Sequence, residues 1–209
     1  MSSIQKKEES TLNKRKIFSG FILLLLLIVF PAMSWFYLNR GLEWRRSVQA
    51  ELRNYGRVRA ANHIFGSEKV NLIQGKVCVL HNFGIQPELT EANKSIMDIG
   101  EKLHNQFGHN DAFRLAMIAS QGSPEFRAYA QKKPGSDGPI WVWTVHLEDW
   151  DAILSQGYNS YCRAENTTPA SHYFALSDTT GMIRCYYDAS KKEETDQMVT
   201  HISLLLPAK

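Results

Sequence analysis

The strongest hydrophobic pattern in the chain is an uninterrupted apolar run near its start. Residues 17–38 contain no charged side chain, and leucine fills every position from 23 to 27. At about 1.5 Å of rise per residue, a helix of this length crosses the ~30 Å hydrocarbon layer of a bilayer. We therefore predict a transmembrane anchor over residues 17–38, in contact with membrane lipid, with a polar cytoplasmic tail over 1–16 and a linker over 39–65.

Small residues inside the apolar run leave open the possibility that it is a signal peptide that is cleaved. Ala32 and Ser34 form a small-x-small site of the kind at which signal peptides are cleaved. The aromatic residues 35–37 continue the run and suit the membrane interface, which favours a retained anchor. Basic residues flank the run on both sides, so the positive-inside rule does not decide the orientation. A short tail before a long domain resembles an uncleaved signal anchor, and we predict a single-pass inner-membrane protein with its domain on the periplasmic side.

Beyond the linker, the hydrophobic period alternates between that of a strand and that of a helix. The apolar run at 77–80 predicts a central strand covered on both faces. Thr90 is a suitable N-cap, and the apolar positions after it repeat at helical spacing until Gly108. Further extended segments are predicted at 113–119, 141–147, 173–177 and 182–187, and further helices at 124–133, at 149–156 and from a capping box at Ser190 to Leu206.

This order of elements specifies a fold class. A strand, helix, strand, helix, antiparallel hairpin and final helix make an α/β protein in which helices flank a layered sheet of thioredoxin type. We predict this thioredoxin-like domain over residues 66–209. A chain of 209 residues is long enough for one such domain and its tether.

The distribution of charge excludes one class of partner. The first 16 residues carry five Lys or Arg and two Glu, a net charge of +3, which equals the net charge of the whole chain. Everything after the tail therefore sums to zero. A neutral domain lacks the basic surface that nucleic-acid binding requires, so we expect no nucleic-acid partner.

A hairpin motif near the C-terminus suggests a family. Residues 174–178 read F-A-L-S-D, and residues 181–188 read G-M-I-R-C-Y-Y-D. Together they resemble the F-x-L-V-D-x-x-G-x-I-R-G-Y-Y-D hairpin of the SCO family, the membrane-anchored copper chaperones of cytochrome c oxidase assembly. Shorter matches at Gly75, at Ser123 and at Trp141 extend this resemblance over about residues 20–206. It implies a thioredoxin-like fold, a copper site and partners among respiratory oxidase assembly proteins.

The cysteines that bind copper in this family are absent from the matching positions. The family carries C-x-x-x-C after its first core strand. Aligned on that strand, the two cysteines fall at Pro87 and Glu91; aligned on the next helix, they fall at Ile85 and Leu89. A thiolate is both the nucleophile of disulfide exchange and the soft ligand that selects Cu(I). We therefore expect a degenerate active site, no copper cofactor and no enzymatic activity.

The family's metal-binding histidine is displaced as well. It lies eight residues before the hairpin aspartate, where this chain has Ala170, and His172 follows two residues later. Strand geometry places residues two apart on the same side of the backbone. His81, at the end of the first core strand, faces the degenerate turn. One alternative function is therefore unconventional metal delivery through His81 and His172.

Three cysteines occur elsewhere in the chain. Cys78 lies within an apolar strand, where we expect an inert small hydrophobe. Cys162 and Cys185 flank the first strand of the hairpin and form a possible disulfide if their Cα atoms come within about 7 Å in an oxidising compartment. A second alternative is thus a thiol-disulfide oxidoreductase that uses this pair. The function that we favour over both alternatives is that of a non-catalytic binding or assembly factor related to respiratory oxidase biogenesis.

Overall fold

The computed structural model describes residues 3–58, 63–65, 68–70, 75–120, 122–132, 140–143, 147–166 and 172–207. The chain forms two compact units, residues 1–48 and residues 49–209. The first unit is helical, and the second contains the β-sheets.

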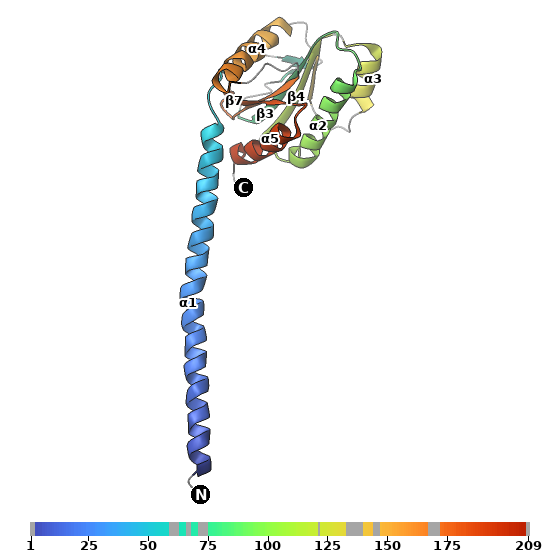
Figure 1. Cartoon of the computed structure of the whole chain (residues 1–209). Helices are drawn as coiled ribbons and strands as arrows, with labels where there is room; N and C mark the ends of the chain where they lie inside the picture. Colours follow the sequence, from blue (N-terminus) through green and yellow to red (C-terminus); the bar gives the residue numbers. More distant parts are fainter. Residues whose placement is uncertain are drawn as a thin grey trace. The chain divides into compact units, whose positions relative to one another are not determined.

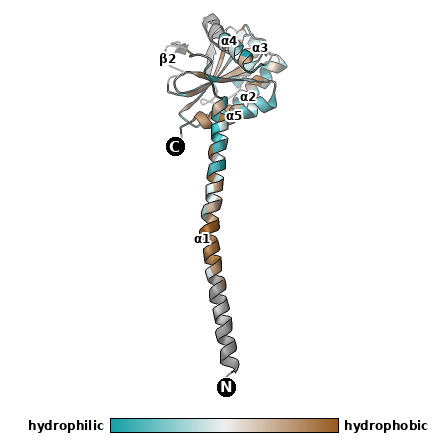
Figure 2. Cartoon of the chain, turned by 60° about the vertical axis from the view of Figure 1, so that its left-hand side comes forward, coloured by the Kyte–Doolittle hydropathy of each residue, from teal (hydrophilic) through white to brown (hydrophobic). Residues whose placement is uncertain are grey.

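Helix α1 forms all of the first unit that the structure describes. It spans Ser3–Glu51 and includes Pro31. From Gly20 onward the helix is long and apolar enough to cross a membrane, a property that signal sequences share (Figure 2). The helix is longer than predicted, because both the polar tail and the start of the linker are helical. These stretches are rich in Lys, Glu, Arg and Leu, which favour helix, and an existing helix extends without the cost of a new nucleus.

The second unit contains a five-stranded mixed sheet with helices on both faces (Figure 1). The spatial order of the strands is β5-β4-β3-β6-β7; β3, β4 and β5 are parallel, and β6 is antiparallel to both β3 and β7. This arrangement confirms the predicted α/β thioredoxin-like fold. The elements are β1 (His63–Phe65) and β2 (Glu68–Val70), which pair separately, then β3 (Val77–Ile85), α2 (Glu91–Phe107), β4 (Phe113–Ser120), α3 (Pro124–Lys132), β5 (Ile140–Trp143), α4 (Leu147–Ala164), β6 (Tyr173–Ser177), β7 (Ile183–Asp188) and α5 (Lys192–Leu205).

Strand β3 is apolar on both sides because both faces of the sheet are covered. Val77 and Val79 belong to the core cluster that includes residues of α2 and α5, whereas Cys78 and Leu80 belong to the cluster beneath α4. All four side chains are buried. The alternation of a pleated strand therefore delivers successive residues to two different cores.

The helix ends confirm some predicted caps and correct another. Thr90 is the N-cap of α2, and its hydroxyl accepts from the amide of Asn93 at 3.2 Å; Gly108 is the C-cap. Helix α4 is longer than the predicted 149–156. The capping box predicted at Ser190 is wrong, because its hydroxyl donates to the carboxylate of Asp188 at 2.7 Å and α5 begins at Lys192.

The residues that follow α1 run along the outer edge of β7. Residues 53–58 form backbone hydrogen bonds with β7 and with the turn before it, and an isolated antiparallel bridge joins Arg57 to Met182. The edge strand is thereby paired on both sides, which removes an open edge. The bonds run from the amide of Arg53 to the carbonyl of Arg184 at 3.0 Å, from Tyr55 to Ile183 at 3.0 Å and from Val58 to Gly181 at 2.9 Å.

Candidate functional site

The turn after β3 is where the resemblance places the reactive thiols. Strand β3 loses its regular register with β4 between Asn82 and Ile85, and the backbone then turns sharply. Gly84 has a φ of 83° and Gln86 a φ of 51°, so both lie in the left-handed region. The amide of Gln86 donates to the carbonyl of Ser120 at 2.9 Å, which fixes the turn against β4. This backbone is ordered by its own hydrogen bonds.

The side chains of the turn contain no sulfur and present one apolar group to solvent. Of the four positions that the resemblance assigns to cysteine, Ile85 and Glu91 are exposed, Pro87 is buried and Leu89 is half-buried. Among the residues that the structure describes, no group of three or more His, Cys, Asp or Glu could hold a metal ion. The turn thus offers no thiolate, and it has no cluster of ligands within the described residues.

His81 lies beneath this turn and is fully enclosed. Its Nδ1 is 2.7 Å from the carbonyl oxygen of Tyr173; because a carbonyl only accepts, Nδ1 carries the proton and Nε2 the lone pair. The ring contacts Phe83 and Phe174, with centroids 4.5 Å and 5.2 Å away. Nε2 is buried and has no hydrogen-bond partner. Burial lowers the pKa of His81 to about 4, so the ring is neutral at pH 7.

His172 is the other predicted metal ligand, and the structure brings it near His81. It is half-buried and comes directly before β6, the antiparallel neighbour of β3. It adjoins Tyr173, whose carbonyl oxygen accepts from Nδ1 of His81, and after burial it contributes to the lowered pKa of His81. Ala170, the position of the family's histidine, lies outside the described residues. The two predicted histidines therefore lie near each other, but Nε2 of His81, the nitrogen with the free lone pair, is buried.

The three cysteines are free thiols, and all are buried. Cys162 on α4 belongs to the core cluster beneath that helix, whereas Cys185 on β7 belongs to the cluster with α2 and α5. The structure therefore does not form the possible disulfide between them, because they are in different cores. Burial raises the pKa of Cys78 to about 12 and that of Cys185 to about 11. Neither is a thiolate at neutral pH, so neither suits disulfide exchange.

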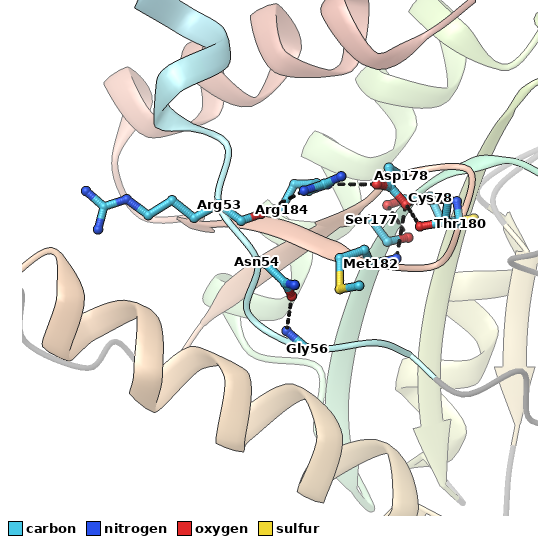
Figure 3. Close-up of polar contacts among 9 residues, drawn as sticks. All are labelled: Arg53, Asn54, Gly56, Cys78, Ser177, Asp178, Thr180, Met182 and Arg184. Atoms are coloured by element: carbon cyan, nitrogen blue, oxygen red, sulfur yellow. Dashed lines mark hydrogen bonds and ion pairs between the residues drawn. The ribbon is translucent and has the colours of Figure 1, made fainter.

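The hairpin motif that suggested the family forms a dense polar network (Figure 3). One carboxylate oxygen of Asp178 accepts from the amides of Thr180 at 2.8 Å and Met182 at 3.1 Å, and from the hydroxyl of Thr180. The other lies 2.7 Å from Nε of Arg184, whose guanidinium also donates to the carbonyl of Arg53 at 3.4 Å. The motif residues therefore close the turn and anchor the segment after α1.

A cluster of five tyrosines was not predicted from the sequence. It lies on the α4 side of the sheet, and the rings of Tyr158 and Tyr173 stack with centroids 3.9 Å apart. The hydroxyl of Tyr186 donates to the carbonyl of Leu154 at 3.1 Å. No local spacing signals this cluster, because α4, β6, β7 and the segment after α1 each contribute. Its members are Tyr55, Tyr158, Tyr161, Tyr173 and Tyr186.

A second polar contact fixes the end of α1 to the other core. Nδ1 of the buried His201 is 2.6 Å from the hydroxyl of Tyr187, and its Nε2 is 3.2 Å from the carboxylate of Glu51. Gln197 donates to the same carboxylate oxygen at 2.6 Å. Burial lowers the pKa of His201, and Glu51 partly offsets this effect. The chain therefore attaches residues 51–58 to its domain through side chains as well as backbone.

Comparison with known proteins identifies the fold. No protein-family model matches the sequence, and no curated protein matches it. The structure is similar to that of BsSco, a member of the Sco family of cytochrome c oxidase assembly proteins in which a disulfide switch was identified. The TM-score is 0.52 at 13% sequence identity, and the match covers 73% of this chain and 94% of that chain.

Other solved structures are also similar to this chain. A putative protein disulfide isomerase from Bacteroides thetaiotaomicron has a TM-score of 0.49 at 16% identity, covering 74% of this chain and 91% of that chain. The soluble domain of Sco1 from Bacillus subtilis has a TM-score of 0.46 at 14% identity, covering 73% and 93%. At 13% identity the likeness to BsSco shows a thioredoxin-like fold, and membership of the SCO family stays a prediction.

Proposed function

We propose that this protein is a membrane-tethered, SCO-like binding or assembly factor that has no copper or redox site. The observation that carries the proposal is the composition of the turn after β3. Ile85, Pro87, Leu89 and Glu91 occupy both alternative registers of the family's cysteine pair. Because the fold is kept while the reacting atoms are replaced, a role in recognition accounts for the domain better than a role in chemistry.

The proposed location follows from the apolar helix and from the resemblance. Residues 17–38 anchor the chain in the inner membrane, and the domain faces the periplasm. The link to respiratory oxidase biogenesis rests on the hairpin motif and on the structural likeness to BsSco, whose family assembles cytochrome c oxidase. The fold by itself does not fix this role, since one fold hosts many functions.

The main experiment measures metal binding and disulfide reduction by the full chain in detergent. We expect no stoichiometric Cu(I) in competition with a chelator and no reduction of insulin. The double variant Ile85→Cys/Leu89→Cys is the matched control, because it restores the C-x-x-x-C spacing on the same turn. Tight copper binding by the wild type at this turn contradicts the proposal.

Genetic complementation tests the proposed role in biogenesis. Cells that lack this protein should assemble less oxidase. The triple variant Cys78→Ala, Cys162→Ala, Cys185→Ala should restore oxidase assembly, provided that the variant protein accumulates to the wild-type level. Loss of assembly with normal accumulation would instead support the thiol-disulfide alternative, which the burial and separation of these thiols disfavour.

One observation favours metal delivery through His81 and His172 as a second candidate. His81 donates through Nδ1 to a carbonyl, the arrangement that orients Nε2 in most metal-ligating histidines. The aromatic enclosure of that Nε2 counts against it, since a metal would need the turn to open. If the candidate is correct, His81→Asn with His172→Asn should abolish metal loading of the full chain; unchanged loading dismisses it.

A further inference from the structure

Ile85 stands out among the side chains of the second unit. Ile85 is 67% exposed, and every other exposed large hydrophobic residue that the structure describes lies on α1, between Phe18 and Trp44. A single exposed apolar residue is common on protein surfaces and needs no explanation by itself. Ile85 differs from other exposed apolar residues in the backbone conformation of the turn in which it lies.

The turn around Ile85 has a strained residue next to it and is supported by hydrogen bonds. Ile85 lies between Gly84 and Gln86, both with positive φ, and Gln86 is a residue type that rarely adopts this region. The side-chain oxygen of Asn82 accepts from the amide of Gly84 at 3.0 Å. Strained backbone persists only where its surroundings over-determine it, and it gathers at sites of function.

The neighbours of Ile85 fill the core without its help. Phe83 packs edge-on against Phe126, with centroids 5.1 Å apart, and also against His81. Phe126 is completely buried, so this side of the core is closed beneath the turn. Ile85 therefore makes little contribution to the core, and a polar residue would satisfy the fold as well.

Two exposed carboxylates belong to the segments that adjoin Ile85. Glu88 follows in the same turn, and Glu125 lies in the first turn of α3, which approaches the loop through a 3.1 Å hydrogen bond from the Ser123 amide to the Pro87 carbonyl. Glu91 is also exposed, but it pairs with Lys94 at 2.7 Å. Between described residues, no ion pair involves Glu88 or Glu125. A complementary partner protein would have an apolar pocket for Ile85 and positively charged side chains at the rim of that pocket.

We propose that Ile85 is the anchor by which this domain docks into an apolar pocket of a partner protein, with Lys or Arg of that partner facing Glu88 and Glu125. This inference rests on the proposed non-catalytic function and identifies the surface that performs it. A rigid turn loses little entropy on binding, and an apolar anchor that fills a desolvated pocket contributes strongly to interface energy. The site of recognition is then the same corner at which the thiols are missing.

Site-specific crosslinking of the full chain in its native membranes tests this surface. A photoreactive benzoylphenylalanine replaces Ile85 or, as a matched control, Asn105, which is exposed elsewhere on α2. We expect an adduct from position 85 alone, joined to a protein peptide that combines apolar residues with Lys or Arg. An absent adduct, an adduct to lipid or an adduct to a second copy of this chain overturns the proposal.

Charge and size variants then test the chemistry of the contact with the crosslinked partner. We expect Ile85→Ser to reduce its copurification at least about tenfold, the loss of one strong anchor, while Ile85→Val keeps most of it. The double variant Glu88→Lys with Glu125→Lys should bind the partner more weakly than the wild type does. This difference should grow as the salt concentration is lowered. Equal copurification by wild type and Ile85→Ser overturns the docking role. Copper binding by the wild type would instead refute the proposed function and leave the crosslink unaffected.

Discussion

Arg184 joins two parts of the domain that are far apart in the sequence. Its Nε lies 2.7 Å from the Asp178 carboxylate within the hairpin, and its guanidinium also donates to the carbonyl of Arg53 beyond α1. One side chain thus completes the turn and holds the segment after α1. The motif that most resembles the SCO family consequently has a structural task in this chain, independent of any metal.

The first prediction concerns this anchor. Arg184→Met should lower the free energy of unfolding by about 1–2 kcal/mol, because the largely buried Asp178 carboxylate loses its charged partner. Hydrogen exchange at residues 53–58 should also become faster. Urea unfolding of the full chain and exchange measured by mass spectrometry check both effects.

Arg53 provides the control for this experiment. Its side chain pairs with Glu165 at 3.4 Å, and the two side chains are 52% and 34% exposed. Arg53→Ala keeps the backbone carbonyl that Arg184 uses, so we expect a change below about 0.5 kcal/mol. If Arg184→Met and Arg53→Ala lowered the free energy of unfolding equally, the contact between Arg184 and Asp178 would contribute no more than an exposed ion pair.

The second prediction concerns the close approach of α4 to the tyrosine cluster. A Cβ on Gly157 would overlap the hydroxyl of Tyr186 and lie 2.9 Å from the carbonyl oxygen of Tyr55. Gly157→Ala should therefore destabilise the chain by about 1–3 kcal/mol, although alanine favours helix by about 1 kcal/mol over glycine. Thermal unfolding of the variant measures the balance.

A double mutant isolates the cause of this loss. Tyr186→Phe removes the hydroxyl that the new methyl group would meet, together with its hydrogen bond to Leu154. In that background the added cost of Gly157→Ala should shrink but not vanish, because the Tyr55 carbonyl remains. An unchanged cost would place the conflict elsewhere in α4.

The third prediction concerns thiol reactivity. All three cysteines are buried, and burial raises the pKa of Cys78 and Cys185. A thiol reagent should modify none of them quickly in the native chain and all three once urea unfolds it. Mass spectrometry of the unreduced chain should find no Cys162–Cys185 crosslink. Fast labelling of Cys185 under native conditions would contradict this.

Local sequence signals predicted the fold well and the site only in part. Thr90 and Gly108 mark the ends of α2 because capping depends on a few neighbouring residues. Ser190 does not cap α5 as its spacing predicts, because its hydroxyl donates to an aspartate two residues earlier in the chain. Ile85 was identified as a missing cysteine, but its exposure depends on a register irregularity in β3 that no spacing reveals.

Long-range contacts account for most of what the sequence did not predict. The nearness of His81 and His172 depends on the antiparallel pairing of β3 with β6, and hydrophobic alternation does not specify which strands pair. The same holds for the contact between Glu51 and His201, which joins residues near the two ends of the second unit. Polar groups of this kind become recognisable only when the topology is known.

The fourth prediction concerns the dependence of stability on pH. His81 has a pKa of about 4 in the folded chain against 6.5 for the free side chain, mainly because it is buried. Between these values the unfolded chain binds a proton that the folded chain does not. Stability from His81 is therefore complete above pH 6.5 and decreases as pH falls towards 4, by up to about 3 kcal/mol. His201, with a lowered pKa, acts in the same direction.

The variant His81→Asn separates the two histidines. An asparagine side chain can donate to the Tyr173 carbonyl from a position close to that of Nδ1, but it does not titrate. Its unfolding free energy at pH 7 should be lower than that of the wild type, because the larger ring no longer fills the space between Phe83 and Phe174. Between pH 6.5 and 4 its stability should fall less steeply, with a remaining slope to which His201 contributes. Urea unfolding at half-unit pH steps measures both slopes, and parallel curves would mean that His81 is already protonated in the folded chain.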